Sequence, residues 1–444
     1  MKLILSILDR IFSLKVLSRL TKHTSFMLNL AASIIVFLPF ILKVIGVFRY
    51  SGIIQVVFML LAGALILLAI MAAVVTQRVI KKDIGFCIIG VLFVFLYSLI
   101  ISPSTIAILS MTLFEFTSIG ICSYIIVRYV QDFDALINIM KKFSYVAVAI
   151  LLLEPFFWIF SDITYMSYSY LLLLPALILS YSAFKYKKAV DIVFSAVAAF
   201  LIIMFGSRGM FLSLVFAYCV FSFVTFRKAL TKIIGTLGTF AVLISLLFTL
   251  PLYLTPVVEK ISEKTIEFKQ TVFSEIENKA PAGNLYKRQK NIIESGQLFY
   301  DSGRRMFFEV GIDIIKKHPL FGVGIAKDKT IIKTKITEIN PARYSGYPVK
   351  AFYPHNLMIE LLVQFGIPLG IIIFSGFVYL IIRAGLISYG ETSFFLLTIF
   401  ISSYIIRLAF SGSYLSYSNY FLLVLGLCVT IIENKRLQAA SEKV

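Results

Sequence analysis

Long apolar runs, separated by short polar loops, extend through most of the chain. Taken as helices, they predict about twelve membrane spans, at residues 26–48, 53–75, 84–102, 105–127, 143–160, 164–183, 189–205, 209–226, 232–250, 356–382, 392–410 and 417–433. A run of about 20 residues is long enough to cross a hydrocarbon core of roughly 30 Å as an α-helix, and a helix satisfies its own backbone hydrogen bonds in lipid. The pattern therefore predicts an all-α polytopic membrane protein.

The basic residues between these runs predict which loops face the cytoplasm. With the N-terminus inside, roughly twenty Lys and Arg residues fall on the cytoplasmic side, against four in the short outer loops: Lys43, Arg49, Arg208 and Arg407. Cytoplasmic loops of membrane proteins carry such an excess of positive charge. Both termini are therefore predicted to be cytoplasmic.

The same topology divides the chain into five segments. Residues 1–25 are predicted to form an amphipathic, basic helix on the cytoplasmic leaflet, since no small-residue cleavage site follows a short apolar core. Spans one to nine occupy 26–250, an outer loop domain occupies 251–355, spans ten to twelve occupy 356–433, and 434–444 form a cytoplasmic tail. A structureless loop of about a hundred residues is uncommon, so the outer segment is expected to have its own fold and a function.

Composition favours this class of protein. Hydrophobic residues make up 59% of the chain and charged residues 15%, whereas soluble domains are about a quarter charged. The net charge of +19 could indicate nucleic acid binding, but the basic residues lie in loops between apolar runs, so no nucleic acid partner is expected. The four cysteines all lie in apolar runs, which favours small buried residues over a disulfide framework or a metal site.

Arginines near the outer face are candidate anion-binding residues. Arg208 lies in the turn "FGSRG", where Gly206 and Gly209 would let a bulky anion approach the backbone; the alternative is a guanidinium that reaches lipid headgroups. Arg304 and Arg305 fall in the first turn of a predicted helix, the wrong end for the helix dipole, so helix stability does not explain them. Their forked donors suit a diphosphate, and ordinary surface charge is the alternative.

The helix that carries these two arginines is predicted to be short and amphipathic, and to rest on the outer membrane surface. Positions 307, 310, 311 and 314 form its apolar face. Ser302 is its expected N-cap, and Pro319 follows its end. His318 is expected to favour the helix C-terminus as a capping cation.

His355 opens the tenth predicted span on the outer face and is the candidate general base. Imidazole has an ordinary pKa near 6.5, which suits proton transfer at neutral pH; the alternative is a histidine ring among lipid headgroups. Tyr353 and Asn356 could orient this ring or a bound sugar. Gly366 and Gly370 would let the following helix pack closely.

Two acidic residues fall within predicted spans. Glu115 and Glu154 are costly there and usually face a cavity, but no partner is evident and their roles stay open. The DFD motif at 132–134 lies in a predicted cytoplasmic loop, away from the other candidates, so nucleotide-sugar binding is not expected there. The chain has no HExxH, GxSxG or Walker sequence.

Three stretches together resemble a known family. They are "GSRG" at a span junction, "SGR" before a helix that ends in "HPLFGVG", and "HNLMIELLVQFGIPLG" at the next span. In this order they are similar to the O-antigen ligase and O-antigen polymerase family of bacterial envelope polysaccharide assembly. The resemblance covers about residues 200–385, and the N-terminal half matches only in hydropathy. Phe307 and Phe308 stand where relatives often carry tryptophan.

The resemblance implies a membrane glycosyltransferase of the broad GT-C type, inverting and metal-independent, with no cofactor. Its donor would be a glycan on undecaprenyl diphosphate, with Arg208 and Arg304 binding the diphosphate and Arg305 beside them. His355 would deprotonate the acceptor hydroxyl. No outer carboxylate cluster that could hold Mg²⁺ is apparent in the sequence.

The predicted activity is polymerisation of O-antigen or capsular repeat units at the periplasmic face of the bacterial inner membrane. A ligase that moves the finished glycan to lipid A–core shares these motifs, and no residue separates the two. A lipid-glycan flippase is the alternative of another class, although it would not normally need a hundred-residue outer domain with positioned arginines. Expected partners are the lipid-linked donor and acceptor, membrane lipids and a chain-length regulator.

Overall fold

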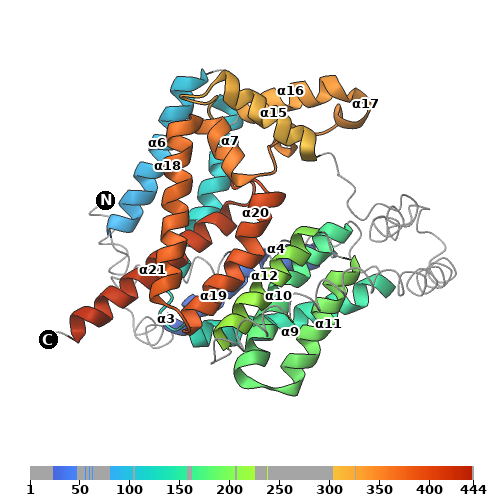
Figure 1. The fold of residues 1–444 in the computed structure, drawn as a ribbon, viewed down its shortest axis with the longest axis vertical. Coiled ribbons are helices and arrows are strands. Elements are labelled where there is room, and N and C mark those ends of the chain that lie inside the picture. The colour runs from blue at the N-terminus through green and yellow to red at the C-terminus, as the bar shows by residue number, and fades with distance from the viewer. Residues whose placement is uncertain are drawn as a thin grey trace.

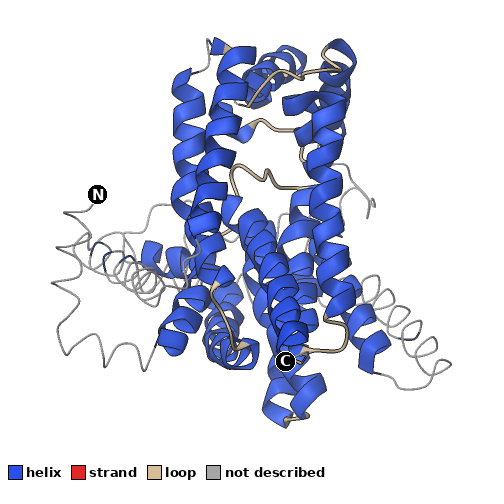
Figure 2. Ribbon diagram, turned by 90° about the vertical axis from the view of Figure 1, so that its left-hand side faces the viewer, coloured by secondary structure: helices blue, strands red, loops and turns tan. Residues whose placement is uncertain are grey.

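The computed structural model describes residues 24–47, 81–103, 106–157, 163–205, 208–225, 304–325 and 327–442, with a few isolated positions between them. Every element in these ranges is a helix, which confirms the predicted all-α class (Figure 2). Among the described residues, four helices are long and apolar enough to span a membrane, or five if a bent helix pair near the N-terminus counts as one span; the four are Phe133–Glu154, Met166–Tyr186, Leu357–Ile387 and Thr392–Phe410. The chain is thus a multi-pass membrane protein. The number twelve stays a prediction, because the spans expected at 53–75 and 232–250 lie outside the described ranges.

The first predicted span, 26–48, is two helices rather than one. Helices α3 (Thr24–Val36) and α4 (Leu38–Val47) meet at an angle of 68°. Pro39 explains the break, because proline has no N–H for the carbonyl of Ile35 and its ring clashes with a continuing helix. The span predicted at 26–48 is therefore a bent helix pair, and its crossing of the membrane stays a prediction.

The other apolar runs that the structure describes in the N-terminal half form helices close to their predicted places (Figure 1). They are α6 (Lys81–Ile101), α7 (Ile106–Glu115), the π-helix η2 (Phe116–Ile121), α8 (Cys122–Arg128), α9 (Phe133–Phe157), α10 (Tyr165–Tyr186), α11 (Ala189–Phe205) and α12 (Arg208–Thr225). The predicted span 105–127 is thus one helical path of three segments. Most of these helices contribute to one large buried core.

Two predicted cytoplasmic loops meet at the end of the bundle opposite to His355. Lys185 forms an ion pair of 2.7 Å with Asp134, and it also donates to the hydroxyl of Thr392. Asp132 accepts a hydrogen bond from the backbone N–H of Ala135 in the first turn of α9. Both aspartates of the DFD motif therefore have structural partners.

Four short helices form a cap at one end of the molecule, beside the first turns of α18 (Leu357–Ile387) (Figure 1). They are α15 (Arg304–Lys317), α16 (Lys327–Ile339), α17 (Pro341–Tyr344) and η3 (Val349–Ala351). The apolar face of α15 is buried as predicted, and it includes Phe307, Val310 and Ile314. These side chains pack on α16, α17 and α18, so the helix is held by protein and does not simply rest on lipid. Residues 251–303 of the predicted outer domain, with Ser302, lie outside the described ranges.

Helix α18 is interrupted at Gly366, and the cap docks into this break. Gly366 has φ +76°, and Pro368 has no N–H to offer to the carbonyl of Gln364. The freed carbonyls of Val363 and Gln364 accept hydrogen bonds of 2.9 and 3.0 Å from the N–H groups of Val323 and Gly324. In return, the N–H of Ile367 donates to Pro319 at 2.7 Å. The motifs "HPLFGVG" and "FGIPLG" therefore interlock through their backbones.

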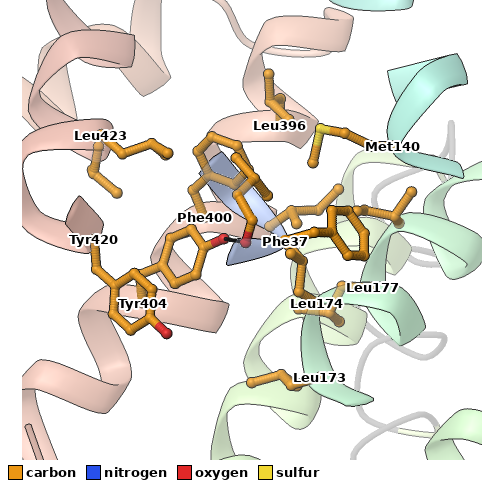
Figure 3. Close-up of a cluster of buried hydrophobic side chains, with 14 of the residues drawn as sticks. Phe37, Met140, Leu173, Leu174, Leu177, Leu396, Phe400, Tyr404, Tyr420 and Leu423 are labelled. Atoms are coloured by element: carbon orange, nitrogen blue, oxygen red, sulfur yellow. Dashed lines mark hydrogen bonds between the residues drawn. The ribbon is translucent and has the colours of Figure 1, made fainter. Parts of the chain in front are cut away.

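The C-terminal helices close the bundle. They are α19 (Thr392–Phe400), the π-helix η4 (Ile401–Ile405), α20 (Ile406–Phe410) and α21 (Ser418–Ser441). Figure 3 shows how Phe400 and Tyr404 pack between Phe37 and Tyr420. The hydroxyl of Tyr404 donates to the carbonyl of Val36, which is left without its helical partner at the end of α3. Chain segments almost 370 residues apart are joined in this way.

Candidate functional site

A cavity of about 480 Å³ lies where the cap meets the membrane helices. Its walls come from four separate parts of the chain: the start of α12, the start of α15, the residues before α18, and the end of α20. The lining residues are Gly209, Leu212, Arg304, Arg305, Phe308, Pro354, His355, Asn356, Ala409 and Phe410. The structure thus brings Arg304, Arg305, His355 and Asn356 to one cavity, and their roles stay predictions.

Arg304 is the innermost cation of the cavity. It is the first residue of α15, and its Nη1 donates to the carbonyl of Phe410 at 3.3 Å, while Nη2 lies 3.7 Å from the sulfur of Met166. Within the described ranges no carboxylate forms an ion pair with it. A partly buried guanidinium that is held only by neutral groups keeps donors available for an anion.

Arg305 occupies a different environment at the edge of the cavity. Its side chain is 80% exposed and pairs with Glu309, four residues further along α15, at 2.8 Å. Exposed pairs of this kind contribute about 0.3–0.5 kcal/mol. Arg305 is therefore less well placed than Arg304 to bind a buried anion.

His355 is held from three sides. Its Nδ1 lies 3.4 Å from the carbonyl oxygen of Ser411, and the Tyr353 hydroxyl donates to the same carbonyl at 3.3 Å. The ring of Tyr353 lies 4.2 Å from the imidazole, and the ring of Phe307 meets it edge-on at 5.0 Å. The backbone of His355 has φ +57°, which is rare for a residue with a Cβ and is sustained only where the surroundings enforce it.

This environment determines the charge of His355. Burial, together with the positive charge of Arg304, lowers the pKa of His355 to about 4, while the Ser411 carbonyl acts in the opposite direction. The imidazole is therefore neutral near pH 7. A carbonyl can only accept, so its position favours the tautomer with the proton on Nδ1, which leaves the lone pair on Nε2. Burial also raises the pKa of Tyr353, which stays a neutral donor.

Asn356 has a structural part in this arrangement. Its side-chain oxygen accepts from the N–H of Ile359 at 3.0 Å and caps the start of α18. Its amide nitrogen donates to the carbonyl of Ala409 at 3.1 Å. It fixes the beginning of α18 against the end of α20, and so contributes to the position of the neighbouring imidazole.

A family model described as O-antigen ligase matches residues 193–374. This range contains α12, the whole cap and the first part of α18, and so it includes Arg208, Arg304 and His355. Residues 193–374 are therefore similar to the O-antigen ligase family, as the order of the sequence motifs indicated. Members of this family are membrane glycosyltransferase-like enzymes. No curated protein matches the chain.

Other predicted residues are less directly placed at this cavity. Arg208 is the first residue of α12 and precedes Gly209, which lines the cavity, but its side chain lies outside the described part. The side chain of Glu115 also lies outside it, whereas Glu154 is fully buried in α9. His318 directly follows α15, where its N–H donates to Ile314.

The segment 409–411 is the part of the site that sequence reasoning missed. The backbone carbonyls of Ala409, Phe410 and Ser411 hold Asn356, Arg304 and His355 respectively. Backbone acceptors leave no signal in the sequence of an apolar run. This segment is the structural counterpart of the predicted arginine and histidine.

A buried polar network holds the residues that directly follow this segment. The carboxylate of Glu360 accepts hydrogen bonds from the hydroxyl of Ser413 and from the N–H of Tyr414. The hydroxyl of Tyr414 donates to Gln364, whose amide in turn donates to Asp328 of α16 at 2.8 Å. Hydrogen bonds between buried polar groups hold these groups in one arrangement. The network therefore ties the loop after α20 to α18 and to the cap.

Proposed function

We propose that this protein is a polymerase for O-antigen or capsular repeat units. It would transfer a growing glycan from undecaprenyl diphosphate onto a new lipid-linked repeat unit, at the periplasmic face of the bacterial inner membrane. The observation that supports this most directly is that Arg304 and His355 line one cavity and are held by the same short segment. A diphosphate binder and a base are the two groups that this transfer needs.

The leaving group requires stabilised negative charge. In the transfer, the bond between the donor sugar C1 and the diphosphate oxygen breaks, and undecaprenyl diphosphate leaves with the electron pair. Arg304, with Arg208 as the second predicted ligand, would stabilise this charge in a poorly hydrated site, where fixed donors act strongly. Guanidinium forks can contact two phosphate oxygens each.

The nucleophile requires a base. The acceptor hydroxyl attacks C1, and its proton would pass to Nε2 of the neutral His355. A base acts efficiently only when it is unprotonated and within hydrogen-bond reach. Attack from the side opposite to the diphosphate would invert the configuration at C1. Inversion, metal independence and the GT-C type remain part of this proposal.

A deletion strain tests the proposal. Surface glycan with a single repeat unit is expected for a polymerase. Full-length polymer that stays on the carrier lipid, together with an unmodified lipid A–core, would indicate the ligase. Loss of translocated repeat units would instead indicate a flippase. Complementation with wild-type protein is the positive control, and complementation with His355→Ala should leave the deletion phenotype unchanged.

A further inference from the structure

A second cavity of about 290 Å³ lies next to the first one, between α4, α10 and the start of α21. Polar and aromatic side chains contribute to its lining: Lys43, Tyr170, Arg407, Ser416, Tyr417 and Asn419. Its cations, Lys43 and Arg407, were predicted to lie on the outer side of the membrane. The role proposed above for the first cavity uses neither of them.

Arg407 has an unusual environment for a buried cation. Its guanidinium lies 3.8 Å from the ring centre of Tyr170 and 4.1 Å from that of Tyr417. Nη1 donates to the hydroxyl of Tyr420 at 3.4 Å, and the buried Nε has no hydrogen-bond partner within the described ranges. No carboxylate among the described residues forms an ion pair with it.

Among the described residues, these contacts give the positive charge of Arg407 no counter-charge. Aromatic faces above and below a guanidinium stabilise it by cation–π attraction, and they restrict further ligands to its edge. A buried charge is otherwise expected to have a counter-charge, because its removal from water is costly. Lys43 lines the same cavity and adds a second positive charge. An anion that enters the cavity would meet both.

The two cavities share a wall. The hydroxyl of Tyr170 forms a hydrogen bond with the hydroxyl of Ser411, whose carbonyl holds His355 and Tyr353. Gly209, which lines the first cavity, lies against the same tyrosine, since a Cβ at this position would be 3.8 Å from the Tyr170 hydroxyl. A ligand in the second cavity would therefore lie close to the base but outside the space beside Arg304.

We propose that Arg407 and Lys43 form a second phosphate site, which binds the diphosphate of the acceptor lipid. This inference rests on the proposed function, because a polymerase joins two substrates that each carry a lipid diphosphate. The Arg304 cavity takes the donor, and the Arg407 cavity takes the acceptor, whose sugar hydroxyl reaches His355 across the shared wall. Phospholipid headgroups offer related phosphate chemistry, and the experiment separates the two sources.

The test measures binding and not transfer, so its outcome does not depend on whether the polymerase proposal holds. Purified full-length protein is titrated with farnesyl diphosphate, and the bound copies are counted by native mass spectrometry. Wild type is expected to bind two copies. Arg407→Gln and Arg304→Gln are each expected to weaken one of the two binding events by about tenfold or more, since charged hydrogen bonds are lost. The double variant should lose both.

A second variant distinguishes loss of the binding site from misfolding of Arg407→Gln. Ser416→Trp places an indole at the second cavity without removing Arg407, and it should also abolish one binding event. Ser441→Trp, at the far end of α21 some 35 Å away by helix rise, is the matched control and should keep two. A single bound copy in wild type, or two copies in both Arg407→Gln and Ser416→Trp, would overturn the proposal. If phosphatidylglycerol vesicles displaced farnesyl diphosphate from both sites equally, this would also overturn the proposal and would indicate a general headgroup site.

Discussion

The pH dependence of transfer tests the assignment of His355 as base. A base works in its neutral form, so kcat/KM should fall as the pH drops through the pKa of the free enzyme. An ordinary histidine with a pKa of 6.5 is about a quarter neutral at pH 6, which would reduce the rate roughly fourfold relative to pH 8. With the pKa of His355 lowered to about 4, the rate should be nearly constant over this interval.

The same structure predicts how a neighbour changes this profile. Arg304 is one of the two causes that lower the pKa of His355, so Arg304→Gln should move the acid limb to higher pH, in addition to its effect on binding. Lys316→Gln, at the exposed end of α15, is a control of equal charge change and should leave the limb in place. The assay is transfer between synthetic lipid-linked repeat units in nanodiscs, from about pH 3 to pH 8, so that the acid limb of the wild type falls within the range.

Two results would refute this reasoning. An acid limb near pH 6.5 in the wild-type protein would show that the imidazole is solvated and not buried beside Arg304. A limb that stays in place in Arg304→Gln, while KM rises, would show that this arginine contacts the substrate without influencing the base.

Four further predictions follow from the same contacts. His355→Ala should lower kcat by about 10²–10⁴-fold in the transfer assay while expression and membrane insertion stay normal; near-normal turnover would remove the base assignment. Arg304→Lys should raise KM or lower kcat, because a point charge replaces a fork. Gly366→Ala should destabilise the protein by on the order of 3 kcal/mol in thermal unfolding, because the φ of +76° disfavours a Cβ and the Leu320 carbonyl occupies the space. Gly376→Ala is the control and should not destabilise the protein, because the space around Gly376 is open. Glu360→Leu should lower kcat by releasing Ser413 and Tyr414, and Glu360→Gln, which can still pair with both, should retain most activity.

Much of the helical architecture could be predicted from the sequence because it depends on local pattern. The apolar runs formed helices near their expected places, and the buried face of α15 follows positions 307, 310, 311 and 314. The bend between α3 and α4 was missed, although Pro39 is a visible signal for it. The break at Gly366 was read only as a close-packing position, because its meaning depends on the "HPLFGVG" loop that fills it.

The candidate site was predictable in its side chains and not in its backbone. Arg304 and His355 stood out because they are polar residues next to apolar runs, and they do line one cavity. The carbonyls of 409–411 carry no sequence signal. Arg407 did carry one, since an arginine within the last turn of an apolar run is expensive in a membrane and points to a function. It was counted only as a loop charge, because its tyrosine neighbours come from α10 and from the start of α21.

The interlock between the cap and the break in α18 has a mechanical consequence. Backbone hydrogen bonds join the loop after α15 to α18, so the helix that begins with Arg304 and the helix that follows His355 move as one body. The loop after α20 is tied to the same body, because Glu360 of α18 accepts hydrogen bonds from Ser413 and Tyr414. A bulky glycan would therefore meet a site in which the predicted phosphate ligand and base keep a constant separation.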